Sequence, residues 1–123
     1  MNRLKRILFV DDEKKIAELV AILFLEYSFN VVIAFSGNEV IKSLKKDHDF
    51  DAIISDLKMS DGNGLDLLLF VNDYYQDQKR TRFIFVSGES DISEMECLDQ
   101  GVNEFFLKPF RVDQIIESLD KYL

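Results

Sequence analysis

Apolar residues gather in five short runs along the chain. The runs cover 7–10, 31–35, 52–54, 83–86 and 105–107. Each run is continuous rather than alternating, and most of its residues are β-branched or aromatic. Such runs are typical of strands that are buried on both faces of a parallel sheet. The pattern therefore predicts five central strands.

Segments with helical spacing of apolar residues follow these runs. Their apolar stripes lie within 16–23, 40–44, 65–69, 92–98 and 112–119. Polar pairs that are typical of helix starts precede three of the stripes, namely Ser36 with Glu39, Asn63 with Asp66, and Asp91 with Glu94. Gly101 indicates where the fourth helix ends.

Strand and helix thus alternate five times, which predicts an α/β fold. Right-handed crossovers would give a doubly wound parallel sheet with helices on both faces. No repeat, low-complexity tract or Gly/Ser/Pro-rich linker interrupts the 123 residues. We therefore expect residues 1–123 to form a single domain, and its ligands to bind beyond the carboxyl ends of the strands.

Charge and composition narrow the classes of partner. The chain has 15 Lys and Arg against 23 Asp and Glu, a net charge of −8. An acidic surface is repelled by nucleic-acid phosphates and anionic lipid, so we expect no direct nucleic-acid binding. The longest apolar run, 19–25, is too short to span a membrane. Cys97 is the single cysteine, which excludes an internal disulfide and favours the cytoplasm.

Side chains that can carry chemistry follow four of the five predicted strands. Asp11 and Asp12 follow the first, Asp56 the third, Ser87 the fourth and Lys108 the fifth. Because the carboxyl ends of parallel strands meet at one rim of the sheet, we expect these groups to converge.

A cluster of three carboxylates needs a cation, since neighbouring negative charges raise each other's pKa. Mg²⁺ suits such a site, because it prefers oxygen ligands and keeps positions for waters or phosphate oxygens. Ser87 and Lys108 would then bind the oxygens of a phosphoryl group. An aspartate can form an aspartyl-phosphate, and Asp56 is the preferred acceptor because Asp11 and Asp12 resemble a metal-binding pair.

Each of these residues also has a structural explanation when taken alone. Asp12 is placed where it could cap the following helix, and Asp56 and Ser87 are ordinary turn and loop residues. Lys108 followed by Pro109 is a common way to end a strand. Their placement at the same end of four different strands favours a shared site.

The motifs around these residues resemble those of receiver domains from bacterial two-component response regulators. The matching stretches are 7–13, 53–59, 64–68, 85–88 and 101–110, in the order and spacing of that family. The resemblance covers the whole chain. It implies the flavodoxin-like strand order 2-1-3-4-5.

The resemblance also implies a role for each residue. Asp56 would take a phosphoryl group from a phosphohistidine of a sensor kinase or a histidine phosphotransfer protein. Asp11, Asp12, Asp56 and the backbone carbonyl of Lys58 would hold Mg²⁺, while Ser87 and Lys108 would bind the phosphoryl oxygens. The protein would be a switch that assists its own phosphorylation and slow dephosphorylation, rather than an enzyme acting on other substrates.

The family's switching device implies further expectations. Ser87 would move onto the phosphoryl group and Phe105 would turn inward, which changes the surface formed by the helix near 92–98, the strand 105–107 and the helix 112–119. That surface would contact a downstream effector protein or an output domain outside this sequence. The bond between Lys108 and Pro109 is expected to be cis. Lys58 and Glu89 are expected to tune the lifetime of the phosphoryl group.

Two residues depart from the family's pattern, and two other functions stay open. Ser60 stands where family members commonly have proline, and Phe105 lacks the hydroxyl of the tyrosine often found there. A small Mg²⁺-dependent phosphatase would need a further general acid or base, for which Asp12 is the one candidate. An adaptor that works without phosphorylation would have no need of three crowded carboxylates.

Overall fold

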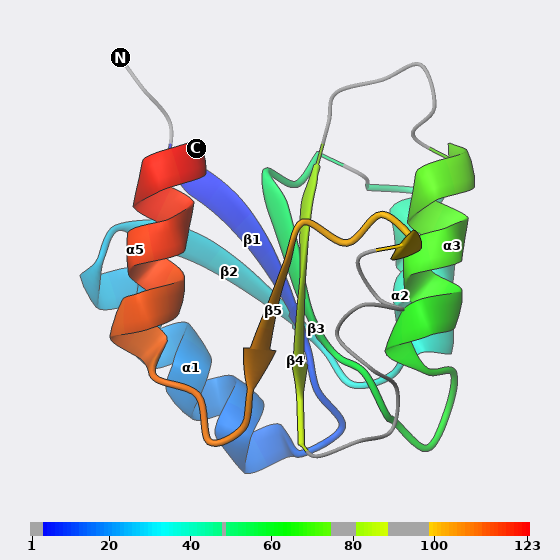
Figure 1. Ribbon diagram of the computed structural model, residues 1–123, viewed down its shortest axis with the longest axis horizontal. Helices are drawn as coiled ribbons and strands as arrows, with labels where there is room; N and C mark the ends of the chain where they lie inside the picture. Colours follow the sequence, from blue (N-terminus) through cyan, green and yellow to red (C-terminus); the bar gives the residue numbers. More distant parts are fainter. Residues whose placement is uncertain (1–3, 48, 75–80, 89–98) are drawn as a thin grey trace.

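The computed structural model describes residues 4–47, 49–74, 81–88 and 99–123, and its centre is a parallel sheet (Figure 1). The strands are β1 (Lys5–Val10), β2 (Phe29–Ala34), β3 (Ala52–Asp56), β4 (Arg82–Ser87) and β5 (Glu104–Leu107). All neighbouring strands pair in parallel, and their order is β2-β1-β3-β4-β5. The predicted sheet and strand order are confirmed.

Helices cover both faces of the sheet. They are α1 (Lys14–Glu26), α2 (Gly37–Leu44), α3 (Gly64–Tyr74) and α5 (Val112–Tyr122). Figure 1 shows α1 and α5 on one face and α2 and α3 on the other. The helix predicted over 92–98 lies outside the described residues. Among the described helices, none combines the length and the apolarity that a membrane span requires.

The core has two layers, one on each face of the sheet. Successive side chains of a strand point to opposite faces, so each strand contributes to both layers. Leu8, Ile53 and Phe83 belong to the layer under α2 and α3. Ile7 and Ile54 belong to the layer under α1 and α5. All five residues of β3 are buried, as the continuous apolar run predicts for a central strand.

The predicted apolar stripe of α1 is confirmed in part, since Val20 is buried and Ile16 packs against the core, but Leu19 is exposed. The stripe within 16–23 includes Leu19, whose side chain is 57% exposed. Ala17, Val20 and Phe24 are the buried residues of the helix. Both sets have helical spacing, and α1 is so rich in apolar residues that periodicity alone does not choose between them.

The predicted helix starts at Ser36 and Asn63 are confirmed. The Ser36 hydroxyl accepts a hydrogen bond from the backbone N–H of Glu39 at 3.0 Å. The Asn63 carbonyl oxygen accepts one from the backbone N–H of Asp66 at 2.9 Å. Each bond satisfies an N–H that has no partner within its own helix. These starts fix the first turns of α2 and α3 beside the loops that follow β2 and β3.

Candidate functional site

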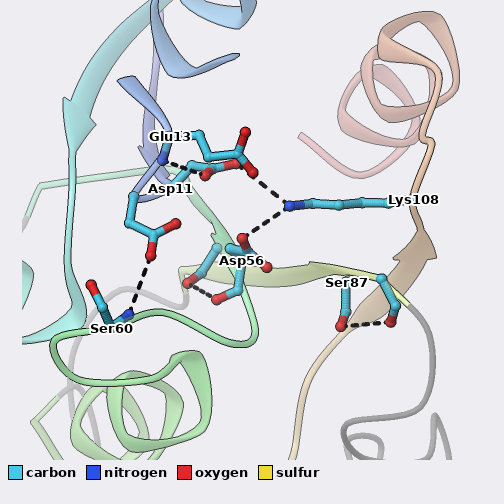
Figure 2. Close-up of polar contacts among 9 residues, drawn as sticks. Asp11, Glu13, Asp56, Ser60, Ser87 and Lys108 are labelled. Atoms are coloured by element: carbon cyan, nitrogen blue, oxygen red, sulfur yellow. Dashed lines mark hydrogen bonds and ion pairs between the residues drawn. The ribbon is translucent and has the colours of Figure 1, made fainter. Parts of the chain in front are cut away.

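Asp11, Asp12 and Asp56 come together at the carboxyl end of the sheet. One potential ligand atom from each residue lies within 4.8 Å of the other two. Strands β1 and β3 are paired neighbours, with Val10 opposite Ser55, so the residues that follow emerge side by side. Figure 2 shows Asp11 and Asp56 directed toward the same space.

The first two carboxylates are held differently. Asp11 is 1% exposed, and its Oδ1 accepts a hydrogen bond from the backbone N–H of Glu13 at 2.9 Å. Asp12 is exposed, and its Oδ2 accepts one from the backbone N–H of Ser60 at 3.2 Å. The residue at the N-cap of α1 is Glu13, which makes no side-chain cap. The capping alternative for Asp12 is therefore wrong, since this carboxylate turns to the loop after β3 instead.

Lys108 enters the cluster from the end of β5. Its Nζ lies 2.9 Å from Oδ2 of Asp56 and 3.8 Å from Oδ2 of Asp11 (Figure 2). Its backbone N–H donates to the carbonyl oxygen of Ser87 at 2.8 Å, which ties it to the end of β4. The bond between Lys108 and Pro109, expected to be cis, is cis in the structure.

Burial dominates the electrostatics of the site. It raises the pKa of Asp11, although the hydrogen bond from Glu13 and the charge of Lys108 act in the opposite direction. It likewise raises the pKa of Asp56, against the hydrogen bond from Lys108. Burial lowers the pKa of Lys108, but its bond to Asp56 and the charges around it outweigh burial and raise that pKa. The ionised carboxylates are therefore costly here, and a further cation would stabilise them.

The donor set fits a hard divalent cation. All three converging groups are carboxylates, and Mg²⁺ combines one or two protein carboxylates with waters or phosphate oxygens. Asp56 also accepts a hydrogen bond from the backbone N–H of Lys58. That bond places the Lys58 backbone beside the cluster, while the ligand role of its carbonyl oxygen stays a prediction.

The remaining predicted residues take different places. Ser87 is 1% exposed at the end of β4, and its hydroxyl donates to the carbonyl oxygen of Gly88 at 2.9 Å (Figure 2). Within the described residues, no hydrogen bond joins Ser87 to the carboxylates or to the amine of Lys108. Phe105 is half-buried and packs against the core layer under α2 and α3. Glu89 lies outside the described residues.

Sequence reasoning missed the contribution of the loop between β3 and α3. Gly64 opens α3, where a Cβ atom would lie 2.5 Å from the carbonyl oxygen of Asp56. A glycine is therefore needed for the first turn of α3 to approach the strand end this closely. The Ser60 N–H on Asp12 was also missed, because it joins residues 48 positions apart through the backbone. A side-chain motif gives no signal for such a bond.

Comparisons with known proteins point to one family. A family model described as the response regulator receiver domain matches residues 7–120. The cell cycle response regulator CtrA of Brucella ovis is 30% identical over 115 residues, which are 93% of this chain and 48% of that protein. Hybrid signal transduction histidine kinase K of Dictyostelium discoideum is 29% identical over 119 residues, or 90% of this chain and 10% of that protein. The chain thus spans half or less of these relatives.

A solved structure agrees with the sequence matches. The receiver domain of the Francisella response regulator 1452 superposes with a TM-score of 0.83 at 28% identity. The match covers 95% of this chain and 94% of that one. This chain therefore shares its fold with that domain over the matched residues.

Proposed function

This chain belongs to the response regulator receiver domain family, and from that membership we propose that Asp56 accepts a phosphoryl group. The family consists of signalling switches in two-component systems. The observation that carries the proposal is the position of Asp56. Its carboxylate lies at the end of the central strand, 2.9 Å from the Lys108 amine and beside the carboxylates of Asp11 and Asp12.

The transfer is a displacement at phosphorus. A carboxylate oxygen of Asp56 forms the new bond to phosphorus, and the bond from phosphorus to the donor's imidazole nitrogen breaks. That nitrogen keeps the electron pair and takes up a proton from water. The donor is a phosphohistidine on a sensor kinase or a histidine phosphotransfer protein. Lys108 holds a phosphoryl oxygen by charge, in the way that preorganised cations assist phosphoryl transfer.

Asp11, Asp12, Asp56 and the carbonyl oxygen of Lys58 are the proposed ligands of Mg²⁺. When bound, this ion supplies positive charge that offsets the carboxylates and the phosphoryl oxygens. In dephosphorylation, a water oxygen bonds to phosphorus, a proton of that water passes to the solvent, and the Asp56 carboxylate leaves with the electron pair. Lys58 and Glu89 are the proposed residues that set how slowly this happens.

Switching would require Ser87 to exchange one hydrogen-bond partner for another. Its hydroxyl donates to Gly88 in this structure, and a phosphoryl group on Asp56 would compete for that donor. We propose that this exchange and an inward turn of Phe105 change the surface of β5 and α5. A downstream effector or an output domain would read that surface.

We propose that residues 1–123 act as one receiver domain in the cytoplasm, with no direct contact to nucleic acid. The net charge of −8 supports the last point, because it disfavours contact with phosphate backbones.

Phosphorylation with a small donor tests the proposal. Acetyl phosphate and Mg²⁺ should add the mass of one phosphoryl group to the protein, and the Asp56→Asn variant should gain none. Asp51→Asn is a matched control, because Asp51 is 6% exposed and Asp56 8% exposed, and Asp51 immediately precedes the strand that Asp56 ends. Asp51→Asn should be labelled like the natural chain.

Three results would contradict this function. Labelling of Asp56→Asn to the same extent would show that another residue is the acceptor. Repeated turnover of a phosphate ester, with no label retained, would show a phosphatase instead. If the natural chain takes no label and the Asp56→Ala variant binds the partner as tightly as the natural chain does, the protein is an adaptor.

A further inference from the structure

Asp12 differs from Asp11 and Asp56 because its side chain is exposed and accepts a hydrogen bond from a backbone N–H that lies 48 positions away in the sequence. Its Oδ2 accepts the hydrogen bond from the N–H of Ser60 at 3.2 Å, and the dashed line that ends at Ser60 in Figure 2 marks this bond. The three carboxylates converge within 4.8 Å while the bond is made. We propose that the Ser60 N–H positions Asp12 for the cation, and that the start of α2 holds Ser60 in place for this task. This inference rests on the proposed Mg²⁺ site.

The loop that carries Ser60 is fastened to α2 directly after that residue. The N–H of Gly37 donates to the carbonyl oxygen of Gly62 at 3.0 Å, and the N–H of Asn38 donates to that of Asp61 at 3.3 Å. The side chain of Asn38 adds a bond from Nδ2 to Oδ1 of Asp61 at 2.7 Å. Two consecutive loop residues are thus tied to the first turn of one helix, which fixes the path of the chain next to Ser60.

The close approach of α2 and the loop depends on two glycines. A Cβ atom on Gly37 would lie 2.4 Å from the carbonyl oxygen of Gly62, which is closer than atoms can approach. Gly62 has φ of 79°, a backbone conformation that favours glycine. The contact between α2 and the loop therefore requires glycine at both Gly37 and Gly62, and it fixes the distance between the helix and the loop.

Asp12 needs such support more than its neighbours do. Asp11 and Asp56 are buried, and bonds from Glu13 and Lys108 orient them. Asp12 is exposed, so without a partner its side chain would lose rotational freedom when it bound an ion. A hydrogen bond to one carboxylate oxygen removes part of that cost in advance and leaves the second oxygen for the ion.

Because the backbone N–H of Ser60 positions Asp12, two substitutions of this residue can separate the N–H from the side chain. Ser60→Pro removes the N–H, since proline has none, whereas Ser60→Ala keeps it and removes only the hydroxyl. Mg²⁺ affinity is measured by calorimetric titration without any phosphodonor. We expect Ser60→Pro to weaken binding about tenfold, the low end of the usual loss for partners of metal ligands, because Asp12 is exposed. Ser60→Ala should stay within about twofold of the natural chain.

Asn38→Ala tests the fastening to α2 separately. It removes the side-chain bond to Asp61 and keeps both backbone bonds, so its loss of Mg²⁺ affinity should have the same direction and be smaller. Urea unfolding in EDTA establishes that each variant is folded. If Ser60→Pro does not fold, Asn38→Ala and Ser60→Ala carry the test, and equal affinity in those two variants overturns the proposal.

The outcomes separate this inference from the proposed function. Equal Mg²⁺ affinity of Ser60→Pro and Ser60→Ala shows that the N–H does not position Asp12, whether or not the protein is phosphorylated. A second outcome is that Ser60→Pro binds Mg²⁺ more weakly than Ser60→Ala, but the natural chain accepts no phosphoryl group from acetyl phosphate. This outcome contradicts the phosphoacceptor function and leaves the positioning role intact.

Discussion

The two ends of β3 carry the same residue type in opposite circumstances. Asp51 precedes the strand and accepts a hydrogen bond from the backbone N–H of Arg6 at 2.8 Å. The guanidinium group of Arg6 reaches Asp47 at 3.0 Å and lies 4.6 Å above the ring of Phe50. At this amino end, the carboxylates of Asp51 and Asp47 therefore bind a backbone N–H and a guanidinium group of the chain itself.

The carboxyl end of the strand is arranged otherwise. Asp56 and Asp11 share the single ammonium group of Lys108, and burial raises the pKa of both carboxyl groups. Asp12 brings a third carboxylate into the same space. The two ends therefore differ in the group that stabilises the carboxylate charge. The chain itself stabilises the charge at Asp51, while an added cation would stabilise the charge at Asp56.

Replacing the cationic side chain at each end of β3 should give the largest difference, which we expect in the rate of labelling. Lys108→Met takes away the charge that faces the phosphoryl oxygens, so the rate of labelling by acetyl phosphate should fall by about a hundredfold or more. Arg6→Met is the matched control, because it removes a cation from the amino end and keeps the backbone N–H that Asp51 accepts. Its labelling rate, measured by mass spectrometry over time, should be unchanged.

The same two variants also test whether the cations at the two ends of β3 have different roles. If Arg6→Met slows labelling as much as Lys108→Met, the two cations are equivalent and the charge at the rim has no special role. Calorimetric titration of Lys108→Met should still show Mg²⁺ binding, since the loss of a positive charge leaves the three carboxylates in place.

Neutralising the two aspartates should change stability in opposite directions. Asp51→Asn removes a charge from a hydrogen bond that the fold uses, and should lower the free energy of unfolding by about 1–3 kcal/mol. Asp56→Asn removes a carboxylate that burial disfavours, and should raise the free energy of unfolding in EDTA by a smaller amount. Urea unfolding at neutral pH measures both.

Saturating Mg²⁺ provides the control for this pair. The ion should stabilise the natural chain and Asp51→Asn by similar amounts, because both keep the cluster, and should stabilise Asp56→Asn less. A loss of stability in Asp56→Asn as large as that in Asp51→Asn, with EDTA present, would mean that both carboxylates are structural.

The sequence predicted the strands and the rim because both depend on local patterns. Continuous apolar runs mark buried parallel strands, and the reactive residues follow those runs directly, so their convergence needs only the fold rule for such sheets. Asp11 and Asp56 illustrate this, since neighbouring strands deliver them to the same place. The helix starts at Ser36 and Asn63 were predictable for the same reason, because a cap lies within one turn.

What the sequence could not predict depends on contacts between distant segments. The bond from Ser60 to Asp12 and the contact between Gly37 and Gly62 arise only when the loop after β3 reaches α2. The buried face of α1 was predicted only in part, because apolar residues cover most of that helix and only packing against the sheet decides which of them are buried. Leu19 is exposed for that reason.

The smallest expected effect is a pH dependence that belongs to the carboxyl end alone. The pKa of Asp11 and of Asp56 is raised in the folded state above the ordinary value of 3.8. A raised carboxyl pKa means that the folded state binds a proton more tightly than the unfolded state does. The resulting stabilisation is fully present below the ordinary pKa, and it disappears as pH rises through the raised value.

In EDTA, the free energy of unfolding should therefore increase as pH falls through the raised pKa values toward 3.8, with a slope below the limit of about 1.4 kcal/mol per pH unit for one group. Lys108 adds no slope in this window, because its raised pKa stabilises the fold at every pH below its ordinary value of 10.5. Asp56→Asn should flatten the profile, whereas Asp51→Asn keeps Asp11 and Asp56 and should keep the slope that they cause. Saturating Mg²⁺ should reverse the slope, since the ion binds the ionised carboxylates. Parallel profiles for all three chains in EDTA would show that the two ends of β3 do not differ in this way.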